Sequence, residues 1–363
     1  MQKIFSPVSF GRLQLRNRIA MAPMTRRKAK KDGIPTPEII EYYRRRAQGE
    51  VGLIISEGTG IDSFHAYDTL TVPRFENDDQ LEGWKKVVDA IHKEGSAFAP
   101  QLWHTGRYAH NPIGPSACKM PDKADGTSRA PVQEMNEHHF AQVLNAYIEA
   151  AQNAEAIGCD AIEIHGAHGY LLDSFVSPAT NKRQDKYGGS LENRIRFPIE
   201  VVRSVRGAVA KDFPIIYRFS QWQLDDYNQV KFANPQQLGM WVTELKNAGV
   251  DILHVSTYDA TSPGFPEVDP QKTLCGWARE LSNLPCIAVG KVTVSLTFNN
   301  AYGDEQDQVA SPQPAFDLIE NNEADLIAVG RALIANPDWV QIVQRGDWQQ
   351  LRPFHKDLLQ DLV

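Results

Sequence analysis

Short, almost continuously apolar segments recur along this chain, and they constrain its fold more than any other feature. Each is rich in Ile, Val, Leu or Ala and has the length of a buried strand. The eight segments are Ile19–Pro23, Gly52–Glu57, Ala97–Trp103, Ala161–His165, Ile215–Phe219, Ile252–Ser256, Cys286–Gly290 and Leu326–Gly330. Such weak alternation of polar and apolar residues is typical of parallel strands that are covered on both faces.

Patterns with helical spacing separate most of these segments. The expected helices are Leu81–Glu94, Phe140–Ile157, Arg194–Ala210, Pro235–Ala248, Gln271–Leu281 and Pro314–Asn321. Several of the connections between strands end in the same way: a Gly or polar residue is followed by an Asp just before the next apolar segment. Asp160, Asp251 and Asp325 are these aspartates. Strand and crossover repeated eight times predict an α/β fold, a single (β/α)8 TIM barrel formed by residues 1–363. A doubly wound open sheet is the alternative, but the turn after the first strand lacks G-x-G-x-x-G.

Two insertions are longer than ordinary connections. Residues 104–138 follow the third strand, and residues 166–193 follow the fourth. Both would therefore lie on the carboxyl-end face of the barrel, where we expect them to act as lids over a substrate.

Composition and charge exclude several classes of protein. The net charge of −7 argues against a nucleic-acid partner. No apolar run approaches the roughly 20 residues of a membrane span, and the N-terminus lacks the apolar core of a signal peptide. The four cysteines are scattered and predict neither disulfides nor a metal centre, as in a cytoplasmic protein. The basic run Arg26–Lys31 is expected to be a solvated loop; attraction of an anionic cosubstrate is the alternative.

Polar residues at the strand ends predict a cofactor pocket, because a barrel brings those ends together. Gln101 offers a paired donor and acceptor, which suits the edge of a heterocycle. Arg218 ends an apolar strand and needs an acidic partner or an anionic ligand. Gly290 and Gly330 permit close approach of the backbone to a ligand, and Arg331 can hold a phosphate with two hydrogen bonds. A planar, phosphorylated cofactor such as FMN fits this set.

The fourth strand ends in a cluster of candidate catalytic residues. His165 and His168 are three residues apart, and Tyr170 follows two residues later. They place hydrogen-bond donors and a proton donor at the end of a buried strand. A zinc site is the alternative for the histidine pair, although no third ligand is obvious and no metal is expected.

Several of these segments resemble, in order, the conserved stretches of the old yellow enzyme family of flavin-dependent ene-reductases. They are Leu15–Thr25, Tyr42–Arg44, Gly52–Gly58, Gln101–Trp103, Ile162–Phe175, Arg183–Arg194 and Asp325–Asp338. The resemblance covers nearly the whole chain. The chain departs from the family pattern after the sixth strand. A pair of small residues that includes glycine is expected there, but this chain has Tyr258, which could narrow the substrate pocket.

The resemblance implies a role for each matching residue. Pro23, Met24, Thr25, Gly58, Gln101, His165 and Arg218 would surround the isoalloxazine of FMN, with Thr25 near its O4 and N5 edge. Gly290, Lys291, Val292, Gly330 and Arg331 would hold the ribityl phosphate. His165 and His168 would donate hydrogen bonds to the carbonyl oxygen of the substrate, and Tyr170 would deliver a proton.

The expected activity is therefore reduction of the activated C=C bond of an α,β-unsaturated carbonyl compound. NADPH or NADH would reduce the FMN, and the partner would be a small-molecule substrate of a monomer or homo-oligomer. Larger family members with an iron–sulfur centre are disfavoured because no cysteine follows Cys286. The alternatives are a barrel aldolase, for which Lys291 is the candidate lysine at a strand end, and a flavin carrier or tRNA-modifying relative.

Overall fold

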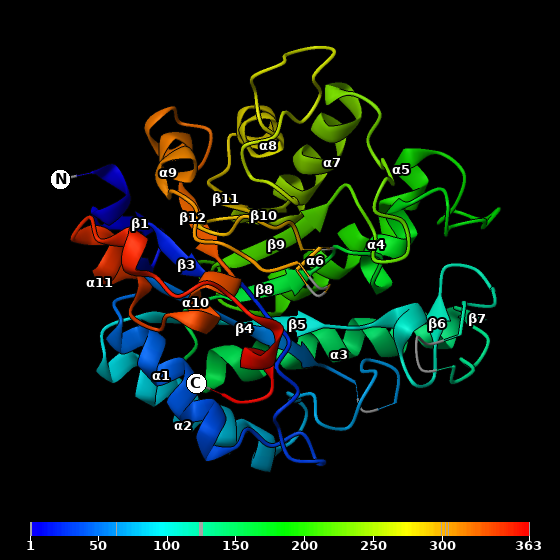
Figure 1. The fold of residues 1–363 in the computed structure, drawn as a ribbon. Coiled ribbons are helices and arrows are strands. Elements are labelled where there is room, and N and C mark those ends of the chain that lie inside the picture. The colour runs from blue at the N-terminus through cyan, green and yellow to red at the C-terminus, as the bar shows by residue number, and fades with distance from the viewer. Residues whose placement is uncertain are drawn as a thin grey trace.

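A closed barrel of eight parallel strands forms the centre of the molecule (Figure 1). The computed structural model describes residues 2–62, 64–122, 126–298, 300–301, 303 and 305–362. The strands are β3 (Ile19–Met21), β4 (Leu53–Gly60), β5 (Ala97–Trp103), β8 (Ile162–His165), β9 (Ile215–Ser220), β10 (Ile252–Ser256), β11 (Cys286–Val289) and β12 (Leu326–Val329). They follow one another around the barrel in chain order, and β12 pairs with β3 to close it. The predicted (β/α)8 barrel is confirmed, with strand boundaries within three residues of those expected.

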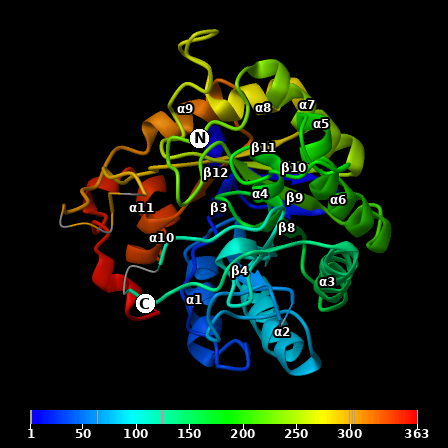
Figure 2. The same cartoon turned by 90° about the vertical axis from the view of Figure 1, so that its right-hand side faces the viewer.

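Helices surround the strands on all sides when the molecule is viewed as in Figure 2. They are α1 (Pro37–Gln48), α2 (Asp78–Lys93), α3 (Glu137–Ala156), α6 (Arg196–Ala208), α7 (Pro235–Ala248), α8 (Leu274–Ser282), α9 (Gln313–Glu320), α10 (Arg331–Ala335) and α11 (Trp339–Gln344). Sequence reasoning missed α1, whose N-cap is Thr36 and whose first residue is Pro37. In the described part of the chain, no helix has the length and apolarity that crossing a membrane requires.

The recurrent aspartate before a strand joins that strand to its neighbour. Asp160, Asp251 and Asp325 accept hydrogen bonds from the backbone N–H groups of Phe98, Ile215 and Cys286 at 2.8, 2.8 and 3.0 Å. Each acceptor lies at the amino-terminal end of the barrel, where the strands begin. The repeated sequence pattern therefore has a structural cause, because a charged acceptor satisfies a backbone donor at the open end of a strand.

The amino-terminal end of the barrel is closed by a hairpin that the sequence did not predict. It consists of β1 (Val8–Phe10) and β2 (Leu13–Leu15), preceded by the 3-10 helix η1 (Lys3–Phe5). Leu13 and Leu15 are buried and pack in one cluster with the inward-facing residues at the starts of the strands. This end of the barrel is therefore an apolar plug.

The two insertions leave the barrel at the carboxyl ends of β5 and β8, as expected. The first contains the 3-10 helix η2 (Gly106–Tyr108) and the short pair β6 (Ile113–Gly114) and β7 (Gln133–Glu134); the second contains α4 (Leu171–Val176) and α5 (Leu191–Arg194). The Tyr108 hydroxyl donates to Asp225, in the loop after β9, at 3.0 Å. The first insertion is thereby tied across the carboxyl end of the barrel.

The basic run beside β3 is a solvated loop only in part, because Arg27, Lys30 and Lys31 are exposed but Arg26 is not. Arg26 is buried, and its Nη2 donates to the carbonyl oxygens of Leu358 and Asp361 at 2.9 and 2.7 Å. Its guanidinium also lies 4.8 Å from the ring centroid of Tyr42. Arg26 thus anchors the C-terminal segment, including the 3-10 helix η4 (Lys356–Leu359), to the rim of the barrel.

Candidate active site

The carboxyl ends of the strands enclose a cavity of about 250 Å³. All but one of the predicted site residues line it: Pro23, Met24, Thr25, Gln101, His165, His168, Tyr170, Arg218, Gly290, Lys291, Val292, Gly330 and Arg331. The exception is Gly58, which packs beneath Trp103. A Cβ atom at that position would lie 2.6 Å from the indole ring, so only glycine fits there.

Arg218 provides a buried cation with unused donor capacity at the base of the cavity. Its Nη2 donates to the hydroxyl of Ser256 at 3.2 Å, whereas its Nε has no hydrogen-bond partner among the described residues. Burial lowers the pKa of Arg218, although the group stays charged. An unpaired buried donor is costly, so an acceptor on a ligand in the cavity would stabilise this side chain.

The two histidines of the site are neutral. Burial lowers the pKa of each imidazole well below its usual value, and the nearby charge of Arg218 lowers it further. The backbone N–H of Ala167 donates to Nδ1 of His165 at 3.3 Å, which leaves the ring proton on Nε2. The rings of His165 and His168 meet edge to face with centroids 5.1 Å apart.

His168 occupies a strained backbone position that its neighbours hold in place. Its φ of +65° is left-handed, which costs a residue other than glycine about 1–2 kcal/mol. Its N–H donates to the Ser220 hydroxyl at 3.0 Å, its Nε2 lies 2.8 Å from the Ser256 hydroxyl, and its ring stacks on Trp222 at 4.2 Å. Strain maintained by so many contacts is typical of a functional position.

Tyr170 presents a protonated hydroxyl to the same cavity. Burial raises the pKa of the phenol, and the carboxylate of Asp68 raises it further. Its ring meets His165 edge to face at 4.9 Å and Trp103 at 5.0 Å. The side chain can therefore donate a proton beside the imidazole donors.

A fully buried ion pair fixes the loop that carries these groups. Lys231 Nζ lies 2.7 Å from the carboxylate of Asp173, and both side chains are almost completely inaccessible. Asp173 accepts the backbone N–H of Gly169 at 2.6 Å, while Lys231 donates to the carbonyl oxygens of Ser220 and Trp222 at 2.7 and 3.1 Å. The loop after β8 is thereby locked to the loop after β9.

The other end of the cavity carries the predicted phosphate-binding residues. Gly290 lies against the loop after β10, because a Cβ atom there would be 2.7 Å from the Thr257 carbonyl oxygen. Part of the Arg331 guanidinium is already engaged, because its Nη1 donates to the buried carboxylate of Asp307 at 3.0 Å. Its role at a phosphate stays a prediction, which requires Asp307 and the phosphate to use different N–H groups.

Comparisons with known proteins agree with this geometry. Residues 3–350 match the model of the NADH:flavin oxidoreductase / NADH oxidase family. The chain belongs to this family, that of the old yellow enzymes. A 12-oxophytodienoate reductase 7 of Oryza sativa is 36% identical over 93% of this chain and 86% of its own length. A NADH oxidase of Thermoanaerobacter brockii is 33% identical over 96% of this chain, but the chain spans only 52% of that relative.

Solved structures of old yellow enzymes superimpose on the whole barrel. Morphinone reductase in complex with tetrahydroNAD has a TM-score of 0.81 at 30% identity, with 98% of this chain and 93% of that chain covered. The old yellow enzyme homologue from Zymomonas mobilis also has a TM-score of 0.81, at 28% identity, with 98% and 96% covered. The predictions of FMN as the bound cofactor and of a nicotinamide donor are confirmed at the level of the family.

The residues present fit FMN at its polar edge. The unpaired Nε of Arg218 offers a donor to a carbonyl oxygen of the pyrimidine ring, and the Gln101 amide lies in the same wall. Lys291 and Arg331 lie at the opposite end, where a phosphate would lie, and they are paired there with Asp259 and Asp307 at 3.4 and 3.0 Å. The zinc alternative receives no support, because no group of three or more His, Cys, Asp or Glu side chains in the described residues could hold a metal ion.

Sequence reasoning missed Glu163, His254, Asp173 and Lys231. Glu163 and His254 alternate with apolar residues on buried strands, and the argument that Arg218 needs an acidic partner could have found Glu163. Lys231 lies in a loop and Asp173 in the six-residue helix α4, and neither segment shows a periodic pattern that distinguishes a buried charge from a solvated one.

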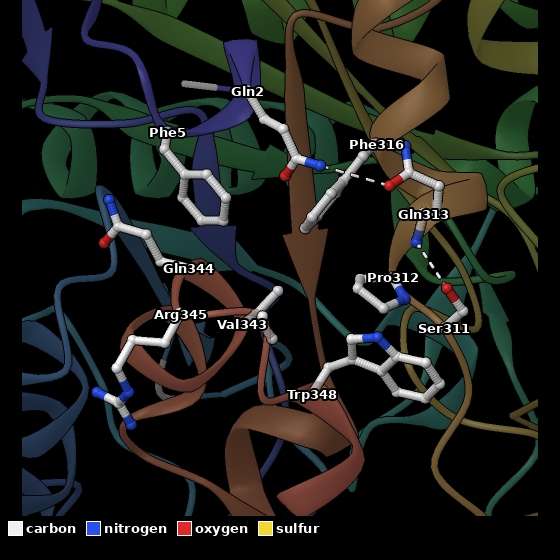
Figure 3. Close-up of a pocket in the computed structure, with 11 residues that line it drawn as sticks. Gln2, Phe5, Ser311, Pro312, Gln313, Phe316, Val343, Gln344, Arg345 and Trp348 are labelled. Carbon is white, nitrogen blue, oxygen red and sulfur yellow. Dashed lines mark hydrogen bonds between the residues drawn. The ribbon is translucent and has the colours of Figure 1, made fainter.

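A larger groove of about 640 Å³ lies away from the strand ends, between η1, α9 and α11 (Figure 3). Phe5 and Phe316 meet edge to face beside it at 5.8 Å, and Gln2 reaches Gln313 across its rim. None of the predicted site residues lines it. Its size therefore does not identify it as the site.

Proposed function

We propose that this protein is an FMN-dependent ene-reductase, which reduces C=C bonds conjugated to a carbonyl group with NADPH or NADH as electron donor. The observation that carries the proposal is the convergence of His165, His168 and Tyr170 in the cavity that also contains Arg218. The names of two relatives, 12-oxophytodienoate reductase and morphinone reductase, point to reductions of the same kind.

The imidazole groups would polarise the substrate. FMN, when bound, supplies the hydride chemistry. His165 and His168 would each donate one N–H to the carbonyl oxygen, where negative charge develops during reduction. Because both rings are neutral, they stabilise this charge without transferring a proton. One preorganised donor of this kind contributes about 3 kcal/mol.

Tyr170 would complete the reaction by protonating the α-carbon. Its hydroxyl keeps its proton at physiological pH because burial raises the pKa of the phenol. Trp103 and Tyr108 hold its ring edge to face at 5.0 and 5.6 Å, which fixes the direction of the hydroxyl. A positioned general acid contributes a factor of roughly 10²–10⁴.

The remaining predictions concern the setting of the enzyme. We propose a small-molecule substrate, with the aromatic wall of Trp222 and the unexpected Tyr258, stacked at 4.7 Å, on one side of it. The single-domain organisation, the cytoplasmic location and the choice between monomer and homo-oligomer stay predictions.

The visible absorption spectrum of the purified protein tests this proposal. We expect a yellow protein whose flavin absorbance disappears when NADPH or NADH is added without oxygen and returns when cyclohexenone is added. A protein that binds FMN but is not reoxidised by any conjugated enone would overturn the proposed reaction. The variant lacking both His165 and His168 should bind phenols at least about 100-fold more weakly, since a phenolate would occupy the position of the charged oxygen.

A further inference from the structure

A layer of polar side chains crosses the inside of the barrel directly below the cavity. Gln101, Glu163, Arg218 and His254 come from β5, β8, β9 and β10, which are consecutive around the barrel. Gln101 is in register with Glu163, and Arg218 is in register with His254. All four are buried, and we call them the interior polar layer. Gln101 and Arg218 also line the cavity, whereas Glu163 and His254 lie beneath it.

Glu163 lies at the centre of the interior polar layer. Its Oε1 accepts from Nε2 of Gln101 at 2.7 Å, and its Oε2 accepts from Nδ1 of His254 at 2.5 Å. Burial alone would raise the pKa of this carboxyl, but His254, Arg218 and Gln101 together outweigh burial and lower it. Burial keeps His254 neutral by lowering its pKa. The layer therefore contains one carboxylate and one guanidinium.

The carboxylate determines which way the Gln101 amide faces. An ionised carboxylate can only accept hydrogen bonds, so the NH₂ group of Gln101 must point toward Glu163. The Oε1 of Gln101 is then the acceptor left for a ligand in the cavity. An imide N–H, as in the pyrimidine ring of a flavin, matches this acceptor, while a carbonyl oxygen matches the neighbouring donor Nε of Arg218.

The carboxylate also offsets the charge of Arg218 below the ligand. The positive guanidinium favours a negatively charged ligand, and reduction of a flavin adds negative charge to the ring. A buried negative group nearby opposes that effect, and the low dielectric of the barrel interior makes the opposition strong.

We propose that Glu163 is a positioning residue that orients Gln101 toward the flavin and, by opposing Arg218, holds the reduction potential of the bound flavin down. The inference rests on the FMN binding that the proposed function includes, but not on the substrate. A protein with normal FMN binding and no alkene reductase activity would overturn the proposed function and leave this test intact.

The variant Glu163→Gln tests the charge, because it keeps the size of the side chain. In this variant we expect the ratio of the affinities for reduced and oxidised FMN to increase at least about tenfold over that of the unaltered protein. For a two-electron couple this corresponds to a rise in midpoint potential of about 30 mV. Equilibration of the holoenzyme with a reference dye measures this potential. Asp160→Asn is the matched control, since it removes a carboxylate that lies just before the same strand, where Asp160 accepts the Phe98 N–H, and not in the interior polar layer. Its potential should equal that of the unaltered protein.

The variant Glu163→Asp separates charge from orientation and replaces the first variant if that one does not fold. The shorter side chain keeps the charge but cannot reach both Gln101 and His254. We expect FMN to dissociate at least about tenfold more readily on dilution, with a potential close to that of the unaltered protein. Unchanged FMN affinity in Glu163→Asp would overturn the orienting role. An unchanged potential in Glu163→Gln, or equal shifts in both variants, would overturn the role of the charge.

Discussion

The two ends of the barrel are built from the same eight strands but have opposite chemistry. Inward-facing residues at the amino-terminal end, such as Ala161 and Ile216, are apolar and belong to one buried cluster with Leu13 of the hairpin. Two residues further along the same strands stand Glu163 and Arg218, and beyond them lies the cavity. On β5, β8, β9 and β10, the polarity of the barrel interior therefore reverses within a few residues.

This contrast separates stability from chemistry. The apolar end gains free energy from burial, about 25 cal/mol per Å². The polar end is less stable for the same buried area, because it buries charged groups and because donors such as Nε of Arg218 have no hydrogen-bond partner among the described residues. Substitutions at the polar end should therefore affect activity as well as stability, whereas those at the apolar end should affect stability alone.

The largest expected effect on activity is at the polar end. Tyr170→Phe should slow reduction of the alkene by roughly 10²–10⁴-fold, because the general acid is lost. Reduction of the flavin by the nicotinamide should stay nearly unchanged, since that half-reaction needs no proton from Tyr170. Stopped-flow measurement of each half-reaction distinguishes the two. Equal slowing of both would contradict the proton-donor role.

The second prediction concerns the contribution of the buried ion pair near the site to the stability of the protein. Lys231→Met leaves the carboxylate of Asp173 buried without its partner, and we expect it to lower the free energy of unfolding by about 3–5 kcal/mol. Denaturant unfolding measures this loss. The double variant Lys231→Met/Asp173→Asn should recover part of the stability, because no uncompensated charge remains. A single variant as stable as the unaltered protein would show that the pair does not hold the loop.

The opposite end should respond in stability alone. Leu13→Ala removes a buried side chain of the apolar plug, and we expect a loss of about 2–5 kcal/mol. The rate of flavin reduction at 25 °C should not change, because Leu13 lies at the opposite end of the barrel and does not line the cavity. A change in that rate comparable with the loss of stability would show that the two ends are coupled.

The fold was predictable from sequence because buried parallel strands have a distinct composition. All eight strands were found, and Ala97–Trp103 and Ile252–Ser256 even have the predicted boundaries. Helix α1 was missed because three consecutive arginines, Arg44 to Arg46, interrupt the apolar pattern around the buried Tyr42 and Tyr43, although Arg46 is itself buried. The hairpin was missed because strands of three residues are too short to show a period.

The site was predictable where residues lie at strand ends and not where they lie deeper or in loops. Thirteen predicted residues line one cavity, since barrel geometry forces strand ends together. Glu163, the partner of Gln101, and the pair formed by Lys231 and Asp173 were not found, because these contacts join residues that are distant in sequence. The ion pair between Arg331 and Asp307 could not be predicted either, because a long loop carries the carboxylate.

The smallest effect concerns a second buried carboxylate at the polar end, Glu57. It accepts the backbone N–H groups of Arg26 and Arg27 at 2.8 and 3.0 Å, directly after the predicted flavin-binding residues that end at Thr25. Burial raises its pKa from 4.5 to about 7, because these hydrogen bonds and the arginine charges offset only part of the cost. The folded protein thus binds this proton more tightly than the unfolded chain does. Protonation of Glu57 therefore adds to the free energy of unfolding, and this contribution is complete below pH 4.5. It is lost as the pH rises through about 7, which lowers the free energy of unfolding by up to about 3 kcal/mol.

Glu57→Gln removes this dependence, because the amide does not ionise and keeps an oxygen for the two N–H groups. We expect the variant to unfold at a higher denaturant concentration than the unaltered protein at pH 8, and the two to differ much less at pH 5. Unfolding curves across this range measure the difference. An advantage that is equal at both pH values would show that Glu57 does not titrate in this range. An advantage confined to high pH would show that the ionised Glu57 lowers the stability of the folded protein at this end of the barrel.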